Sequence, residues 1–113
     1  MTEERRVELW QGRDHNGTRT IWAALVADGS LKIEGQDLGA GVAIWGEGFT
    51  EYEWDWTVAA VDVPRAVEIL GGNAGDDPLE LLKGWSRDSG GRDPGQHLKS
   101  AGLTLGFWSR VGD

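Results

Sequence analysis

The chain has 113 residues, enough for one domain with one hydrophobic core, and a formal net charge of −8. It contains no cysteine, which excludes disulfides, thiolate metal sites and a cysteine nucleophile and is typical of a reducing compartment. No apolar run approaches the roughly 18 residues of a membrane span, and the N-terminus lacks the apolar core of a signal peptide. We therefore expect a cytoplasmic protein that does not bind a membrane.

The negative charge is concentrated in one part of the chain. Residues 28–62 hold eight of the 19 acidic residues and a single lysine, whereas the rest of the chain holds 11 acidic and ten basic residues. Because binding to nucleic acids depends on Lys and Arg that neutralise phosphates, the composition argues against a nucleic-acid partner. A concentrated negative charge instead favours a basic protein partner.

The N-terminal third has the composition and periodicity of β-strands. We expect strands at 6–11 and 18–27, separated by a polar turn at 12–17. Asp28-Gly29 lies between apolar runs and predicts a two-residue hairpin turn. Apolar and polar residues then alternate over 31–34, which predicts the next strand of an antiparallel meander.

The middle of the chain is predicted to hold a long loop followed by the longest strand. Residues 35–48 include five glycines and are predicted as a loop interrupted by a short strand at 42–45. The segment 49–61 is rich in aromatic and β-branched residues and is the longest strand candidate.

The C-terminal half changes to a helical pattern at Asp62. Asp62 and Gly71 are predicted to begin and end a first helix, which carries an apolar stripe at helical spacing between them. The segments 77–80 and 93–96 both begin with Asp-Pro, a typical start for two further helices. Residues 103–110 are predicted to return as a final strand. The fold prediction is a single α+β domain over 1–113, with an antiparallel sheet of four to six strands and two or three helices packed on one face.

The segment 51–58 carries the clearest functional pattern. Side chains at i and i+2 of a strand share a face, so its rings and carboxylates separate. One face receives Tyr52, Trp54, Trp56 and Val58, and the other receives Glu51, Glu53 and Asp55. We expect the aromatic face to pack under the helices and the acidic face to point outward.

Three like charges in a row cost free energy through repulsion, so they need an explanation. Basic residues of neighbouring strands, with Arg6, Arg19 and Lys32 as candidates, could neutralise them, or an outside partner could do so. Three interpretations remain: a solvated face that discourages edge pairing, a docking surface for a basic protein, and catalytic or metal-binding carboxylates. Carboxylates along one strand diverge, so they cannot form a cation cage alone.

The chain shows no motif for catalysis or for a cofactor. His15 and His97 have no motif partner, and no serine lies in a G-x-S-x-G elbow. The glycine-rich stretch does not complete a phosphate-binding motif. We therefore expect neither an enzyme nor a cofactor or metal site.

Four short motifs support a family resemblance over residues 43–111. They are Glu51-Tyr52-Glu53-Trp54, Asp62-Val63-Pro64, Gly71-Gly72, and Gly102 followed by Gly106-Phe107-Trp108-Ser109. Together they resemble a group of small acidic bacterial proteins that is similar in style to the immunity proteins of polymorphic-toxin systems. The resemblance implies a cytosolic protein that binds a toxin domain, but it transfers no functional residue to this chain.

The leading hypothesis is a non-enzymatic immunity protein that blocks a basic toxin domain through an acidic sheet face. The residues expected to bind the partner are Glu34, Asp37, Trp45, Glu47, Glu51, Glu53 and Asp55. The alternative is a small enzyme or ligand-binding domain with a pocket between sheet and helices. That pocket would be lined by Trp54, Trp56, Trp85 and His97. Both a monomer and a homodimer formed through an exposed sheet edge stay open.

Overall fold

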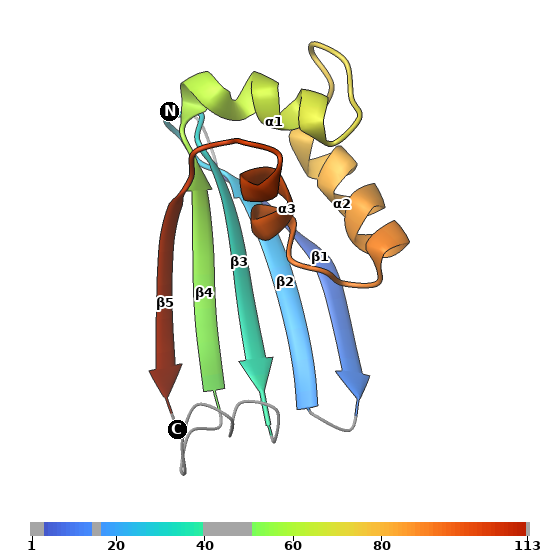
Figure 1. Ribbon diagram of the computed structural model, residues 1–113, viewed down its shortest axis with the longest axis vertical. Coiled ribbons are helices and arrows are strands. Elements are labelled where there is room, and N and C mark those ends of the chain that lie inside the picture. The colour runs from blue at the N-terminus through green and yellow to red at the C-terminus, as the bar shows by residue number, and fades with distance from the viewer. Residues whose placement is uncertain (1–3, 15–16, 40–50, 113) are drawn as a thin grey trace.

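The sheet is a five-stranded antiparallel meander. The computed structural model describes residues 4–14, 17–39 and 51–112 (Figure 1). Its strands, in order across the sheet, are β1 (Arg5–Asp14), β2 (Gly17–Leu25), β3 (Leu31–Leu38), β4 (Glu51–Val58) and β5 (Gly106–Gly112). Each strand pairs with the next one in the chain. The predicted α+β fold is thus confirmed.

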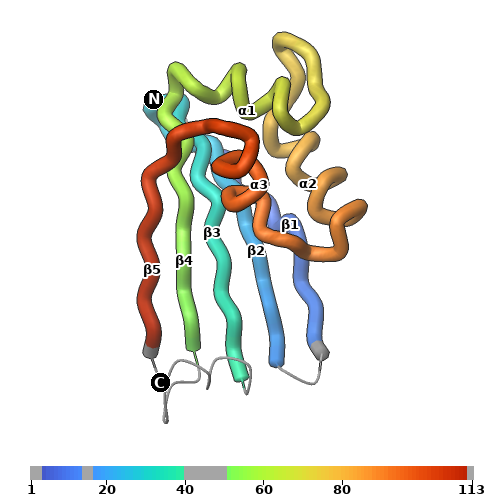
Figure 2. The backbone as a smooth tube through the Cα atoms, viewed as in Figure 1, coloured from blue at the N-terminus to red at the C-terminus, as the bar shows by residue number. Residues whose placement is uncertain are grey.

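The helices all lie between β4 and β5 in the chain and on one face of the sheet. They are α1 (Val63–Ile69), α2 (Pro78–Ser89) and α3 (Pro94–Ser100), and a 3-10 turn (Ala60–Asp62) precedes α1. Figure 1 shows α1 across one end of the sheet, and α2 packs on β1 and β2. The smooth trace in Figure 2 shows that no helix covers the halves of β4 and β5 that lie away from α1.

All three helices begin after the predicted residue, which is Asp62, Asp77 or Asp93, and two of these side chains act as caps. Asp77 accepts a hydrogen bond from the Leu79 backbone N–H at 3.0 Å, and Asp93 accepts one from that of Gly95 at 2.9 Å. The cap predicted at Asp62 is wrong. Its side chain makes no cap hydrogen bond, because its backbone is already helical at the end of the 3-10 turn (φ −96°, ψ −6°).

The turn between β2 and β3 differs from the predicted two-residue hairpin. Val26 and Ser30 are hydrogen bonded at 2.9 Å, and the Gly29 N–H donates to the Val26 carbonyl at 2.9 Å. The loop therefore has three residues, 27–29, and its last residue takes the positive φ of 91° that favours glycine. Asp28-Gly29 marked the right place, but Ala27 belongs to the turn as well.

Two predicted loops are partly strand. The polar residues 12–14 belong to β1, and β3 continues through Gly35 to Leu38. The loop prediction at Gly35 was wrong because this glycine makes space for a ring. A Cβ at Gly35 would collide with the six-membered ring of Trp54, its partner on β4. The predicted strand at 42–45 lies outside the described residues.

The core forms between the helices and the inward face of the sheet. Its fully buried members include Ile21, Leu31, Ile33, Val58, Leu79, Leu82 and Leu98. Trp54 and Trp56 are only 4% and 5% exposed, so two large rings of β4 belong to this core. The predicted separation of rings and carboxylates along β4 is confirmed, and the rings lie on the helix-bearing face.

The space over Gly35 gives a test of the fold. Gly35→Ala is expected to lower the free energy of unfolding by about 1–3 kcal/mol, because a methyl group there displaces a packed indole. Gly106→Ala is the matched control, since a Cβ at this strand glycine meets only Thr57 at 3.7 Å. Urea denaturation of both variants provides the measurement. Equal stability of the two variants would contradict the packing described here.

Candidate functional site on the open sheet face

The strand registers place one residue from each strand in a single row across the open face. Glu8 pairs with Trp22, Trp22 with Glu34, Glu34 with Asp55, and Asp55 with Trp108. We call these five residues the acidic row: Glu8, Trp22, Glu34, Asp55 and Trp108. Their chain neighbours, such as Ile33 and Trp54, point into the core, so the row faces away from the helices. Along the row, Glu34 and Asp55 lie between the two tryptophans, and Glu8 lies on the other side of Trp22.

Glu34 and Asp55 lie directly opposite each other on adjacent strands, an arrangement that repulsion destabilises. Arg6 relieves one half of this conflict, with its guanidinium 2.9 Å from the Glu34 carboxylate. The same guanidinium lies over the Trp22 ring, 5.0 Å from its centroid. Over the described ranges, Asp55 has no ion pair. The protein's own cation therefore satisfies Glu34 and leaves Asp55 uncompensated.

The remaining acids of β4 are neutralised from β5. Arg110 lies 3.4 Å from the Glu51 carboxylate and 3.3 Å from that of Glu53. The neighbouring Glu51 carboxyl group, and after it the Arg110 guanidinium, lower the pKa of Glu53 below its ordinary value. Glu53 therefore stays ionised to lower pH than an isolated glutamate.

Only one of the three suggested neutralising residues acts on the open face. Arg6 does so, whereas Arg19 lies on the helix-bearing face, where it pairs with Asp37 at 2.8 Å. Lys32 forms no ion pair within the part of the chain that is described. The open face carries charges from nine described residues: Arg6, Glu8, Arg13, Lys32, Glu34, Glu51, Glu53, Asp55 and Arg110. Its excess of negative charge is thus local to the acidic row.

The acidic row borders a shallow hollow of about 280 Å³. The hollow is lined by Trp22, Glu34, Gly35, Gln36, Glu53, Trp54, Asp55 and Trp108. Three residues expected to bind a partner, Glu34, Glu53 and Asp55, therefore converge at one place. Trp22 and Trp108 were not predicted as site residues, since only the register reveals that they flank the same carboxylates.

The other expected binding residues lie elsewhere. Glu51 shares the open face but does not line the hollow. Asp37 is on the opposite face, in the pair with Arg19. Trp45 and Glu47 lie outside the described residues. The single acidic surface expected from the sequence is thus divided between the two faces of the sheet.

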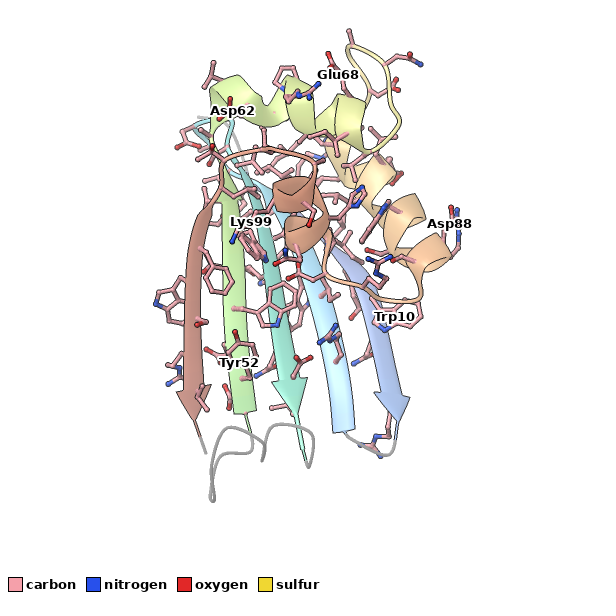
Figure 3. The ribbon with its side chains drawn as sticks, viewed as in Figure 1. Trp10, Tyr52, Asp62, Glu68, Asp88 and Lys99 are labelled. Carbon is pink, nitrogen blue, oxygen red and sulfur yellow. The ribbon has the colours of Figure 1, made fainter. Side chains whose placement is uncertain are left out.

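A second hollow, of about 340 Å³, opens on the helix-bearing face beside α3. It is lined by Arg19, Asp37, Tyr52, Trp54, Trp56, Asp93, Gln96, Lys99 and Phe107. Figure 3 shows Lys99 over the half of β4 near α3 and Tyr52 over the other half of the strand. Trp54 and Trp56 line this hollow as the alternative hypothesis expected, but Trp85 and His97 do not. They stack on each other instead, with ring centroids 4.8 Å apart.

Asp93 connects this second hollow to the core. Its carboxylate caps α3 and accepts a hydrogen bond from Trp56 Nε1 at 3.0 Å. Burial raises the pKa of Asp93 above its ordinary value, although the hydrogen bond from Trp56 acts in the opposite direction. The folded protein therefore binds a proton here at a pH where the unfolded chain has already lost it.

Among the described residues, no group of three or more His, Asp or Glu side chains is arranged to hold a metal ion. None of the helices in the described ranges has the length and apolarity needed to cross a membrane. Comparison with protein-family models, with curated proteins and with solved structures finds no match.

The raised pKa of Asp93 gives a prediction with a defined sign. As pH rises through the ordinary pKa that Asp93 has in the unfolded chain, and then through its higher pKa in the folded protein, the wild type loses stability at this group. Asp93→Asn keeps a capping oxygen but does not titrate. Urea denaturation at several pH values should therefore show Asp93→Asn gaining stability relative to the wild type as pH rises from about 3 to 7.

Asp93→Ala controls for the hydrogen bonds. It removes the helix cap and the acceptor of the Trp56 indole, so we expect it to be less stable than Asp93→Asn by about 1–2 kcal/mol at all pH values. If the stability of Asp93→Asn relative to the wild type stayed constant or declined as pH rises, that result would contradict the raised pKa.

Proposed function

We propose that the protein is a non-enzymatic binding protein that recognises a basic protein at the acidic row and inhibits it, as an immunity protein blocks a toxin domain. The observation that supports this proposal is the uncompensated Asp55 beside Trp108 and opposite Glu34. A cation entering there would relieve the repulsion between the two carboxylates and would also meet an exposed ring. Inhibition and the toxin class are supported by the sequence resemblance.

The internal contacts of Arg6 support the same chemistry. This residue already combines an ion pair to Glu34 with a position over Trp22. Asp55 and Trp108 form the mirrored combination at the other end of the row, and Trp108 is 49% exposed. A guanidinium or ammonium group of a partner would contact Asp55 and Trp108 there, as Arg6 contacts Glu34 and Trp22. Exposed tryptophans and arginines are also the residue types that dominate binding energy at protein interfaces.

The first experiment uses a defined basic probe. Hexa-arginine is titrated into the protein at low ionic strength, with binding measured by calorimetry. Asp55→Asn is expected to weaken binding about tenfold, because a hydrogen-bonded charge pair contributes about 1.5 kcal/mol or more. Trp108→Ala should weaken it as well. Asp88→Asn is the matched control, since this carboxylate lies on α2, far from the row in sequence, and is 78% exposed.

A substitution at Phe107 tests which face of the sheet binds hexa-arginine. It precedes Trp108 on β5 and is equally exposed, at 51%, but it points to the helix-bearing face, where it packs on Trp56. Phe107→Ala should leave hexa-arginine binding unchanged. If Phe107→Ala weakens binding and Trp108→Ala does not, the binding surface is the helix-bearing face and the proposal is wrong.

Inhibition needs a separate test. We expect a neighbouring gene to encode a secreted protein with a basic C-terminal domain. Co-expression of that domain in a bacterial host should stop growth, and the wild-type protein should restore it. Asp55→Lys should fold but fail to restore growth, because it reverses the charge that receives the partner. A basic domain that is toxic and is not neutralised by the wild-type protein would contradict the inhibitory role.

A second candidate function is supported by the hollow on the helix-bearing face. Its aromatic floor and its polar rim, which includes Asp93 and Lys99, have the composition of a small-ligand site. If this is the site, a screen of small aromatic compounds followed by Trp fluorescence should find ligands whose binding Phe107→Ala abolishes and Trp108→Ala does not affect. A screen without such a ligand would count against this second function.

A further inference from the structure

The two edges of the sheet differ in their protection against further strand pairing. β1 carries a bulge at Leu9, between Glu8 and Trp10, and α2 packs along it. Bulges and covering helices are devices by which proteins block pairing at a sheet edge. At the other edge, β5 pairs with β4 in an uninterrupted register, and residues 106–110 are all exposed. Figure 1 shows no element on the outer side of β5.

The sequence of β5 lacks the residues that usually protect an edge strand. It contains neither proline nor lysine, and it presents Phe107 and Trp108, about half exposed, on opposite faces. Arg110 is held toward β4 by its ion pairs with Glu51 and Glu53, so its charge does not cover the outer edge. A regular, aromatic edge strand of this kind is a template for another strand.

The occupant that best fits this edge is a second copy of β5. Residues 107–111 read Phe-Trp-Ser-Arg-Val. An antiparallel pairing of two copies centred on Ser109 brings residues of the same sheet face opposite each other. Phe107 then lies opposite Val111 of the second copy on the helix-bearing face. Trp108 lies opposite Arg110 of the second copy on the open face, and each contact occurs twice across the two-fold axis.

We infer that the protein forms a homodimer through antiparallel pairing of β5 with β5 of a second copy, centred on Ser109. The two five-stranded sheets join into one continuous sheet, with both acidic rows on the same side. The two acidic rows would then meet at the paired β5 strands, because each row ends at Trp108 of β5. This inference does not rest on the proposed function, because the pairing uses the backbone of β5 and its test uses Ser109, which lies on the helix-bearing face. Trp108 belongs both to the acidic row and to the paired strand.

The absence of cysteine from the chain allows a direct test. In Ser109→Cys the two new thiols face each other across the axis. Paired antiparallel residues have Cα atoms about 4.5–5.5 Å apart, which is within the range of a disulfide. We expect this variant to oxidise to a covalent dimer at least about tenfold faster than Gly106→Cys. In the proposed register the two copies of residue 106 lie at opposite ends of the paired strands, so Gly106→Cys is the matched control.

Light scattering on the wild-type protein gives the second measurement. The molar mass should rise from 12.3 kDa toward twice that value as the concentration increases from about 10 μM to 1 mM. A wild-type protein that stays at the monomer mass throughout, together with equal oxidation rates of the two cysteine variants, would overturn the inference. Pairing of β5 only with a strand of a different protein would give that same result and would equally overturn the homodimer.

Discussion

The packing of the Trp54 indole over Gly35 is the contact on which the two faces of the sheet depend. These residues are partners on β4 and β3, and the ring occupies the space where any other residue would carry its Cβ. A slip of one residue between the two strands would remove that space and turn every side chain of β4 to the other face. The contact therefore fixes which residues of β4 enter the core and which ones face outward, with Asp55 among the outward residues.

Once the register is fixed, the electrostatics of the open face follow from the positions of the arginines. Long side chains on the outer strands reach inward over the acids of β3 and β4, Arg6 from one side and Arg110 from the other. Exposed pairs of this kind contribute little to stability, but they decide where charge stays uncompensated. Within the described acidic row, Glu8 and Asp55 form no ion pair, and Asp55 lies beside the exposed ring of Trp108. The fold thus leaves Asp55, with the ring beside it, open to a cation.

Much of the fold could be predicted from local sequence, because its signals act over a few residues. The alternation over 51–58, the Asp-Pro starts at Asp77 and Asp93, and the glycine that ends α1 all gave correct elements. The errors came from residues whose role depends on distant partners. Gly35 has the composition of a loop residue but serves as space for a ring, and Asp62 lacks a cap because the preceding 3-10 turn is already helical.

The candidate site was predictable only in part, for the same reason. Spacing along β4 placed Glu53 and Asp55 on one outward face. Trp22, Glu34 and Trp108 reach the same row through three separate strand registers, which no pattern within a single strand specifies. The register also separated Asp37 from the other acids, because it lies an odd number of positions from Glu34 along β3.

The central claim is that a basic partner binds at the acidic row, and the indole N–H signals of the tryptophans test it most directly. In a ¹H–¹⁵N spectrum, addition of hexa-arginine should shift the indole signals of Trp22 and Trp108 and leave that of the buried Trp56 in place. A spectrum in which the Trp56 signal shifts and those of Trp22 and Trp108 do not, or in which none of the three shifts, would contradict the account.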